Sequence, residues 1–159
     1  MKVIGYKWVH VDTSPRQLAG AALVSSWDAR EWTRGTNHSN YAPSSEQPWG
    51  FNAYLSARRA RWNGQVYGTA MVGVVGFGVV ALYEHGWRAE KAEIVAVCIP
   101  RFGQYRVATD LPLAEVIARL RAAYDVPVFR SVRHLRRETE RWGVSAKTFL
   151  SDTNPDADT

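Results

Sequence analysis

Between residues 67 and 99 the chain reads YGTAMVGVVGFGVVALYEHGWRAEKAEIVAVCI. Glycines at positions 68, 73, 76 and 78 interrupt a run rich in β-branched residues, and this mixture weakens a helix. It suits strands that bend, or that another backbone approaches closely. Polar residues at 84–86 divide this first apolar run from a second one at 94–99. The pattern predicts a curved hairpin with its turn at residues 84–88.

The first third of the chain combines one clear strand with a long irregular stretch. Period-two alternation predicts a strand at residues 2–11. Residues 12–48 are rich in Ser, Thr, Asn, Pro and Gly, so we expect loops around a short apolar piece at 18–24. Residues 51–55 fit either a strand or the start of a short helix, and the pattern does not decide between them.

The last third of the chain is predicted to be mainly helical. After a short strand at 104–108, apolar residues spaced i, i+3, i+4 and i+7 predict an amphipathic helix over 113–124. An extended segment at 126–129 precedes a second helix, which Ser131 caps and Gly143 ends. The apolar face of this second helix is expected to contain Val132, Leu135, Thr139 and Trp142.

The order of these elements predicts the fold class. Strands come first and helices last, without the alternation of a doubly wound fold. We therefore predict one α+β domain over residues 1–150, with a strongly bent antiparallel sheet or partial barrel on which C-terminal helices pack. Residues 151–159 carry three aspartates and no basic residue, and we expect them to form a disordered acidic tail.

Composition favours an anionic partner. The formal net charge is +5 and the pI is about 9.6, and the chain holds seven tryptophans, more than packing usually needs in a small domain. RNA or DNA is therefore the first partner to consider. A lone cysteine, Cys98, lies inside an apolar run, where we expect it to be a buried hydrophobe in a reducing compartment. With no signal peptide and no apolar run long enough to cross a bilayer, we expect a cytoplasmic chain without a membrane partner.

Two arginine clusters are candidate nucleic-acid contacts. The first contains Arg58, Arg59 and Arg61 beside Trp62. The second falls on the polar side of the last helix, and its members are Arg130, Arg133, Arg136, Arg137 and Arg141. Basic residues next to aromatic ones are typical of single-stranded nucleic-acid binding, because the bases stack while the cations neutralise phosphates. The alternative is that these faces are simply solvated.

The predicted hairpin turn is a third candidate. Arg88 can grip a phosphate or a base edge at two points, while Trp87 stacks on a base and Glu90 orients Arg88 from the same strand face. His85 lies beside them at the turn. In the purely structural alternative, Trp87 fills the end of the barrel and Arg88 forms an ion pair with Glu90.

The sequence holds no catalytic signature. The four histidines lack metal-ligand spacing, and no nucleophile elbow, zinc-protease motif or phosphate loop is present. We therefore assign no catalytic residue, no metal site and no cofactor. A small hydrolase or nuclease that uses His85 as general base remains an alternative.

One stretch resembles a known group of sequences. Residues 75–80, which end in Gly-Val-Val, and residues 84–92, which read Glu-His-Gly-Trp-Arg-Ala-Glu-Lys-Ala, resemble a pattern of Gly-x-Val, a His and then Gly-(Trp/Tyr)-Arg-Ala-Glu-x-Ala in uncharacterised small proteins of actinobacteria and their phages. In those proteins a Cys-x-Cys element stands where this chain has Gln47 and Trp49. If the cysteines bind metal there, the resemblance implies that aromatic packing by a buried Trp49 replaces that brace here. A looser similarity to PUA-like domains, which are small bent barrels, implies binding of RNA or modified bases.

These observations lead to one hypothesis and a rival. We expect a non-catalytic nucleic-acid-binding domain that uses the hairpin turn and the arginine clusters. The rival is a protein-interaction module, phage-encoded and acting on a host protein, with exposed Trp and Arg side chains as anchors.

Overall fold

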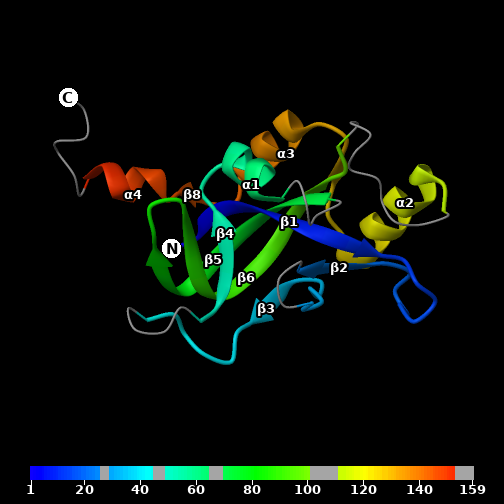
Figure 1. The fold of residues 1–159 in the computed structure, drawn as a ribbon, viewed down its shortest axis with the longest axis horizontal. Coiled ribbons are helices and arrows are strands. Elements are labelled where there is room, and N and C mark those ends of the chain that lie inside the picture. Colours follow the sequence, from blue (N-terminus) through cyan, green and yellow to red (C-terminus); the bar gives the residue numbers. More distant parts are fainter. Residues whose placement is uncertain (26–28, 45–48, 65–69, 101–110, 153–159) are drawn as a thin grey trace.

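The computed structural model describes residues 1–25, 29–44, 49–64, 70–100 and 111–152, and it has the predicted α+β architecture (Figure 1). The strands are β1 (Val3–Asp12), β2 (Ala22–Ser25), β3 (Thr36–His38), β4 (Phe51–Tyr54), β5 (Ala70–Leu82), β6 (Gly86–Cys98), β7 (Val128–Phe129) and β8 (Val144–Ser145). The helices are α1 (Ala57–Gly64), α2 (Leu113–Tyr124), α3 (Val132–Thr139) and α4 (Lys147–Asp152).

These strands form one strongly curved sheet, as predicted. It is antiparallel except where the short strands β7 and β8 run parallel to β6 and β1. The long strand β5 pairs with both β1 and β6, and β4 pairs with the other edge of β6. The curvature is large enough for β4 to meet β1 as well, through the pair Tyr6 and Tyr54.

The predicted hairpin is confirmed as β5 and β6. Its register shifts between Gly73 and Val74 and again between Phe77 and Val80. Such bulges increase the local twist and bend the strand that carries them. The bends therefore fall within the glycine-containing half of the hairpin, where the sequence predicted curvature.

Trp87 explains two of the glycines around it. Its side chain is 1% exposed, and its indole Nε1 donates a hydrogen bond of 2.9 Å to the Ile4 carbonyl. A Cβ added to Gly76 would lie 2.5 Å from Cζ3 of this indole, and one added to Gly5 would lie 2.6 Å from Nε1. Because both clashes involve a large buried ring, the two glycines provide the slot that Trp87 fills.

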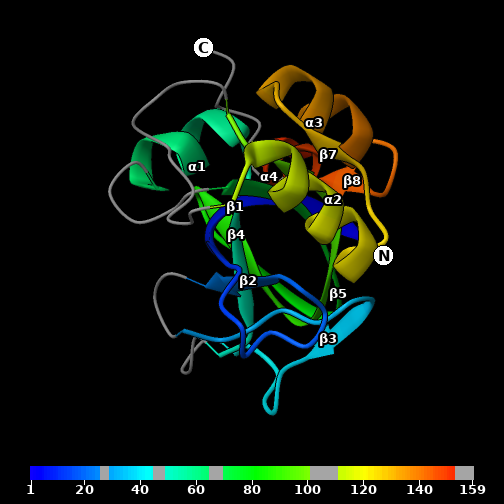
Figure 2. The ribbon, with the colours of Figure 1, turned by 90° about the vertical axis from the view of Figure 1, so that its right-hand side faces the viewer.

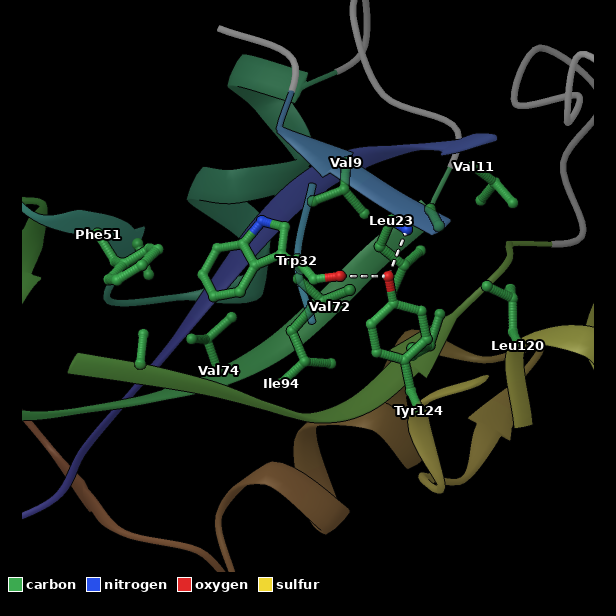
Figure 3. Close-up of a cluster of buried hydrophobic side chains, with 14 of the residues drawn as sticks. Val9, Val11, Leu23, Trp32, Phe51, Val72, Val74, Ile94, Leu120 and Tyr124 are labelled. Carbon is green, nitrogen blue, oxygen red and sulfur yellow. Dashed lines mark hydrogen bonds between the residues drawn. The ribbon is translucent and has the colours of Figure 1, made fainter. Parts of the chain in front are cut away.

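The concave side of the sheet encloses the main core (Figure 3). The ring of Trp32 packs against that of Phe51, with 5.0 Å between their centroids. Tyr124, from α2, closes this core. Its hydroxyl donates to the Trp32 carbonyl at 2.8 Å and accepts from the Leu23 amide at 2.6 Å. These two hydrogen bonds connect α2 to β2 and to Trp32 inside an otherwise apolar core.

The convex side of the sheet is covered by α1, which packs on β1, and by α3, which packs on β5 and β6 (Figures 1 and 2). Leu135 of α3 is fully buried there with Tyr6 of β1 and with Cys98, whose thiol pKa is raised to about 12 by burial. Thr139 of α3 contacts Gly73 so closely that a Cβ at position 73 would overlap its Oγ1. This glycine therefore sets how near α3 comes to the sheet.

Several boundaries differ from the predictions. Of the two alternatives for residues 51–55, the strand is right, because residues 51–54 form β4. The helix that carries the first arginine cluster is α1, and it begins only at Ala57. The apolar piece expected at 18–24 begins its strand only at Ala22, and β3 was not predicted. The strand expected at 104–108 lies outside the described residues. The disordered tail expected over 151–159 is wrong for Ser151 and Asp152, which belong to α4, and residues 153–159 lie outside the described part.

The second predicted helix is right in its position and wrong in its ends. Ser131 occupies the N-cap, but its side chain makes no capping hydrogen bond. The helix ends at Thr139, before Gly143. Because the helical path stops there, Trp142 does not join the apolar face and is 44% exposed.

Candidate functional site

A cleft of about 600 Å³ opens on the convex side, between α1, α3 and the segment β8–α4. Strand β1 and the residues that link β4 to α1 contribute the rest of its lining. We call it the α1–α3 cleft, and its lining residues are Ile4, Tyr6, Leu55, Ser56, Ala57, Arg58, Arg136, Glu140, Gly143, Val144, Ser145 and Lys147.

The charges around this cleft are predominantly positive. Three cationic side chains come from three separate helices: Arg58 from α1, Arg136 from α3 and Lys147 from α4. One carboxylate, Glu140, follows α3. Among the described residues, none of these four side chains makes a hydrogen bond or an ion pair, and all four are exposed. The excess positive charge is therefore available to a ligand.

Several arginines elsewhere in the described structure have a hydrogen-bonded partner within the fold. Arg16 pairs with Asp12 at 2.8 Å, and Arg34 pairs with Asp125 at 3.0 Å. Arg130 donates from Nε to the Ile99 carbonyl at 2.8 Å. These three guanidinium groups have partners within the fold, whereas the side chains of Arg58, Arg136 and Lys147 have none among the described residues.

Tyr6 lies at the floor of the cleft. Its side chain is 3% exposed, yet its hydroxyl makes no hydrogen bond to any described residue. Burial raises the pKa of Tyr6 to about 12, with nearby Glu140 adding to the increase and Arg136 opposing it. The hydroxyl oxygen itself is not fully buried, because among the described residues Tyr6 Oη is not one of the fully buried side-chain polar atoms without a hydrogen-bond partner. The floor therefore presents a neutral polar group to whatever enters the cleft.

The hairpin turn does not form the site predicted for it. The prediction that Trp87 stacks on a base is wrong, because this side chain is buried in the main core. The structural alternative, in which Trp87 fills the barrel end, agrees with this burial. Its neighbour Arg88 points to the opposite face of β6, because successive strand residues alternate.

Glu90 does not orient Arg88 either. A carboxylate oxygen of Glu90 accepts a hydrogen bond of 3.2 Å from the Val79 amide across the hairpin. Arg88 forms no ion pair with Glu90 or with any other described residue, so the predicted structural ion pair is also absent here. Arg88 is partly exposed and lies opposite Asn52, on the same sheet face as Tyr54, the strand partner of Tyr6.

The first arginine cluster does meet the turn and the cleft. Arg59 of α1 contacts both ring nitrogens of His85, at 3.1 and 3.2 Å, while Arg58 lines the cleft one residue earlier. Arg61 and Trp62 also belong to α1, and their side chains lie outside the described part of the structure. Helix α1 thus contacts the hairpin turn through Arg59 and lines the cleft through Arg58.

The second cluster reaches the cleft from α3. Arg136 lines it, whereas Arg133 and Arg137 are exposed on other sides of the same short helix. Sequence reasoning grouped these arginines but gave no role to Tyr6, Glu140 or Lys147. Tyr6 alternates with Ile4 and Trp8 on one strand face, a pattern that indicates burial and carries no signal for a site.

The described residues offer little for the hydrolase alternative. His85 is exposed, and besides Arg59 it has the carboxylate of Glu84 at 3.6 Å. No group of three His, Cys, Asp or Glu side chains in the described part of the chain could hold a metal ion.

The prediction that a buried Trp49 replaces a metal site by aromatic packing is wrong about its burial. Trp49 is 49% exposed, and its ring packs against that of Tyr41.

Comparisons with known proteins add no assignment. No protein-family model, curated protein or solved structure matches this chain. The resemblances to small actinobacterial and phage proteins and to PUA-like domains therefore stay predictions. No helix in the described ranges is long and apolar enough to cross a membrane.

Proposed function

We propose that this protein is a non-catalytic nucleic-acid-binding domain whose contact surface is the α1–α3 cleft and its arginine-lined rim. The observation that carries the proposal is the set of three cations, Arg58, Arg136 and Lys147, around one cleft without an ion pair to any described residue. Phosphates supply the matching charge, and guanidinium groups bind them at two points.

The neighbouring exposed arginines extend this surface. Arg133 and Arg137 lie on α3, and Arg88 lies on the sheet face beyond Tyr54. In this proposal the cleft residues make the closest contacts, and the outer arginines attract and orient the strand through longer-range electrostatics. Phosphate contacts of this kind carry no sequence information by themselves.

Salt dependence tests the proposal. Each phosphate that is neutralised on a single strand releases counterions and contributes about −0.7 to the slope of log K against log salt. Three cleft cations therefore predict a slope of roughly −2 for a single-stranded oligonucleotide, measured by fluorescence anisotropy over a series of salt concentrations. Absence of binding to RNA and DNA at low salt would refute the proposal.

A charge-matched control separates the cleft from the basic chain as a whole. The variant Arg58→Ala/Arg136→Ala is expected to weaken binding roughly tenfold or more and to reduce the slope by about 1.4, because two phosphate contacts are lost. The control Arg16→Ala/Arg34→Ala removes the same charge from arginines that are already paired. Its binding should stay close to that of the parent.

A protein partner is the second candidate function, and one observation favours it. Tyr41 and Trp49 are 64% and 49% exposed and pack against each other, with 5.6 Å between ring centroids. Exposed aromatic side chains are common anchors of protein interfaces. If a partner protein is captured by the parent and lost with Tyr41→Ala/Trp49→Ala, while the cleft double variant still captures it, this function replaces the first.

A further inference from the structure

The floor of the α1–α3 cleft differs from its rim. Ile4, Leu55 and Val144 supply apolar surface to the lining, and Tyr6, a largely buried side chain, adds a hydroxyl that no described residue hydrogen-bonds. A floor made for a phosphate would present several donors and no apolar surface. A nucleobase has flat apolar faces and a polar edge, which matches an apolar floor that carries one hydroxyl.

The carboxylate of Glu140 also distinguishes a base from a phosphate. It lies near enough to Tyr6 to raise the pKa of that hydroxyl, together with Arg136, which acts in the opposite direction. A carboxylate repels a phosphate but accepts hydrogen bonds from the N–H groups on a base edge. Tyr6 can then serve an acceptor of the same edge, because a hydroxyl both donates and accepts.

The three cleft cations, which include Arg136, are arranged to hold the backbone of such a nucleotide. Arg58 and Lys147 are exposed and come from α1 and α4, on different walls from Glu140. The cleft volume of about 600 Å³ lies within the range of small-ligand pockets, roughly 300–1,000 Å³. One nucleotide therefore suits the cleft better than a continuous stacked strand.

We propose that the α1–α3 cleft receives one unstacked nucleotide of the bound strand, with its base on the apolar floor and its polar edge facing Tyr6 Oη and Glu140. Its phosphates lie at the rim beside Arg58 and Lys147. This inference rests on the proposed nucleic-acid binding and adds a base-reading subsite to it.

The test combines Tyr6→Phe with a strand that has no bases. Tyr6→Phe removes only the hydroxyl, which has no hydrogen-bond partner among the described residues, so the melting temperature should not fall. Affinity for a single-stranded oligonucleotide should fall roughly two- to tenfold, as for one hydrogen bond. On an abasic oligonucleotide of equal length, the parent and Tyr6→Phe should bind equally, with the same salt slope.

Two results would overturn the subsite. If Tyr6→Phe weakens binding to the abasic strand as much as to the normal one, the hydroxyl contacts the backbone. If it weakens neither strand, while Arg58→Ala/Arg136→Ala still abolishes binding, nucleic-acid binding stands and the nucleotide subsite fails. If the parent binds no oligonucleotide at any salt concentration, the proposed function itself fails. These three outcomes are distinguishable in one set of titrations.

Glu140→Gln gives an independent measurement. The substitution keeps the shape of the side chain and replaces its charge by an amide that both donates and accepts. The parent should bind oligo(dA), oligo(dC) and oligo(dT) with different affinities, and Glu140→Gln should reduce those differences. A parent that binds all three equally, or a variant that keeps the same differences, would contradict base reading by this carboxylate.

Discussion

The β5–β6 turn and the α1–α3 cleft assemble their side chains in opposite ways. At the turn, residues 84–88 place an acid, an imidazole, an indole and a guanidinium next to one another in sequence. The fold then separates them, since Trp87 enters the core and Arg88 faces outward. In the cleft, residue 6, residue 58 and the segment that contains 136, 140 and 147 come from three distant parts of the sequence and meet on one surface.

Strand geometry causes this difference. Consecutive residues of a strand point to opposite faces, so a dense polar and aromatic motif on a strand is divided between inside and outside. The cleft is lined by residues of β1, α1, α4 and the end of α3, and the contact between Gly73 and Thr139 sets how near α3 comes to the sheet. Proximity in sequence was therefore a poor guide to the site in this chain.

Trp87→Ala should produce the largest effect and tests whether the turn is scaffold. The side chain is 1% exposed and its Nε1 is hydrogen-bonded to Ile4, so its removal leaves a large cavity and an unsatisfied carbonyl. We expect a loss of about 3–5 kcal/mol in the free energy of unfolding, measured with denaturant. Trp49→Ala, at a half-exposed position, should cost about 1 kcal/mol or less. Similar losses for both variants would contradict this division.

Gly76→Ala tests the same slot from the other side. The added methyl group would lie 2.5 Å from Trp87 Cζ3, so the indole or the strand must move. Overpacking of this kind costs about 1–3 kcal/mol. Val79→Ala, on the same strand at an exposed position, is the control and should stay within about 0.5 kcal/mol of the parent. A neutral Gly76→Ala would show that Trp87 does not need the slot.

The sequence was sufficient for much of the fold, because those elements depend on local pattern. The alternation at residues 2–11, the glycine-containing hairpin and the stripe of α2 predicted β1, β5, β6 and α2. The strongly curved sheet followed from the same glycines. Strand β3 was missed because it has only three residues, and its pairing with β6 depends on a partner more than 50 residues away.

The candidate site could be predicted only in part, because its geometry depends on contacts distant in sequence. The arginines of both clusters were visible as charge, and the structure brings Arg58 and Arg136 to one cleft. The sequence offered the burial of Trp87 as one of two alternatives and could not decide between them, since the slot that Trp87 fills depends on Gly5 in another strand. The exposure of Trp142 depends on α3 ending at Thr139, four residues before the glycine that was expected to stop it.

The dependence of unfolding on alkaline pH tests the burial of Tyr6 at the floor of the cleft. Burial raises the pKa of Tyr6 to about 12, so the neutral phenol is favoured in the folded state. Its contribution to stability is therefore complete below the ordinary pKa of about 10 and is lost as pH rises through about 12. Tyr6→Phe should lose less stability than the parent over that interval. Tyr124, whose pKa burial also raises, remains in both proteins and serves as the internal control.

An alkaline titration tests the neighbours of Tyr6. Glu140→Gln should lower the pKa of Tyr6, and Arg136→Ala should raise it, because the first removes a repelling charge and the second an attracting one. The pKa can be followed by NMR of tyrosine labelled at Cζ. Unchanged titration in both variants would mean that neither charge lies close to the hydroxyl, which would also remove Glu140 from the proposed base contact.

Arg88 gives the smallest effect and decides whether the turn contributes to binding at all. Because Arg88 has no ion pair with a described residue, Arg88→Ala and Arg88→Lys should both stay within about 0.5 kcal/mol of the parent in unfolding. As an outer phosphate contact, Arg88→Ala should reduce the salt slope by about 0.7, while Lys keeps the charge and restores most of the affinity. Destabilisation of about 3–5 kcal/mol in Arg88→Ala would instead identify a buried ionic partner. Binding by Arg88→Ala equal to that of Arg16→Ala/Arg34→Ala would confine the interface to the cleft and leave the turn as scaffold alone.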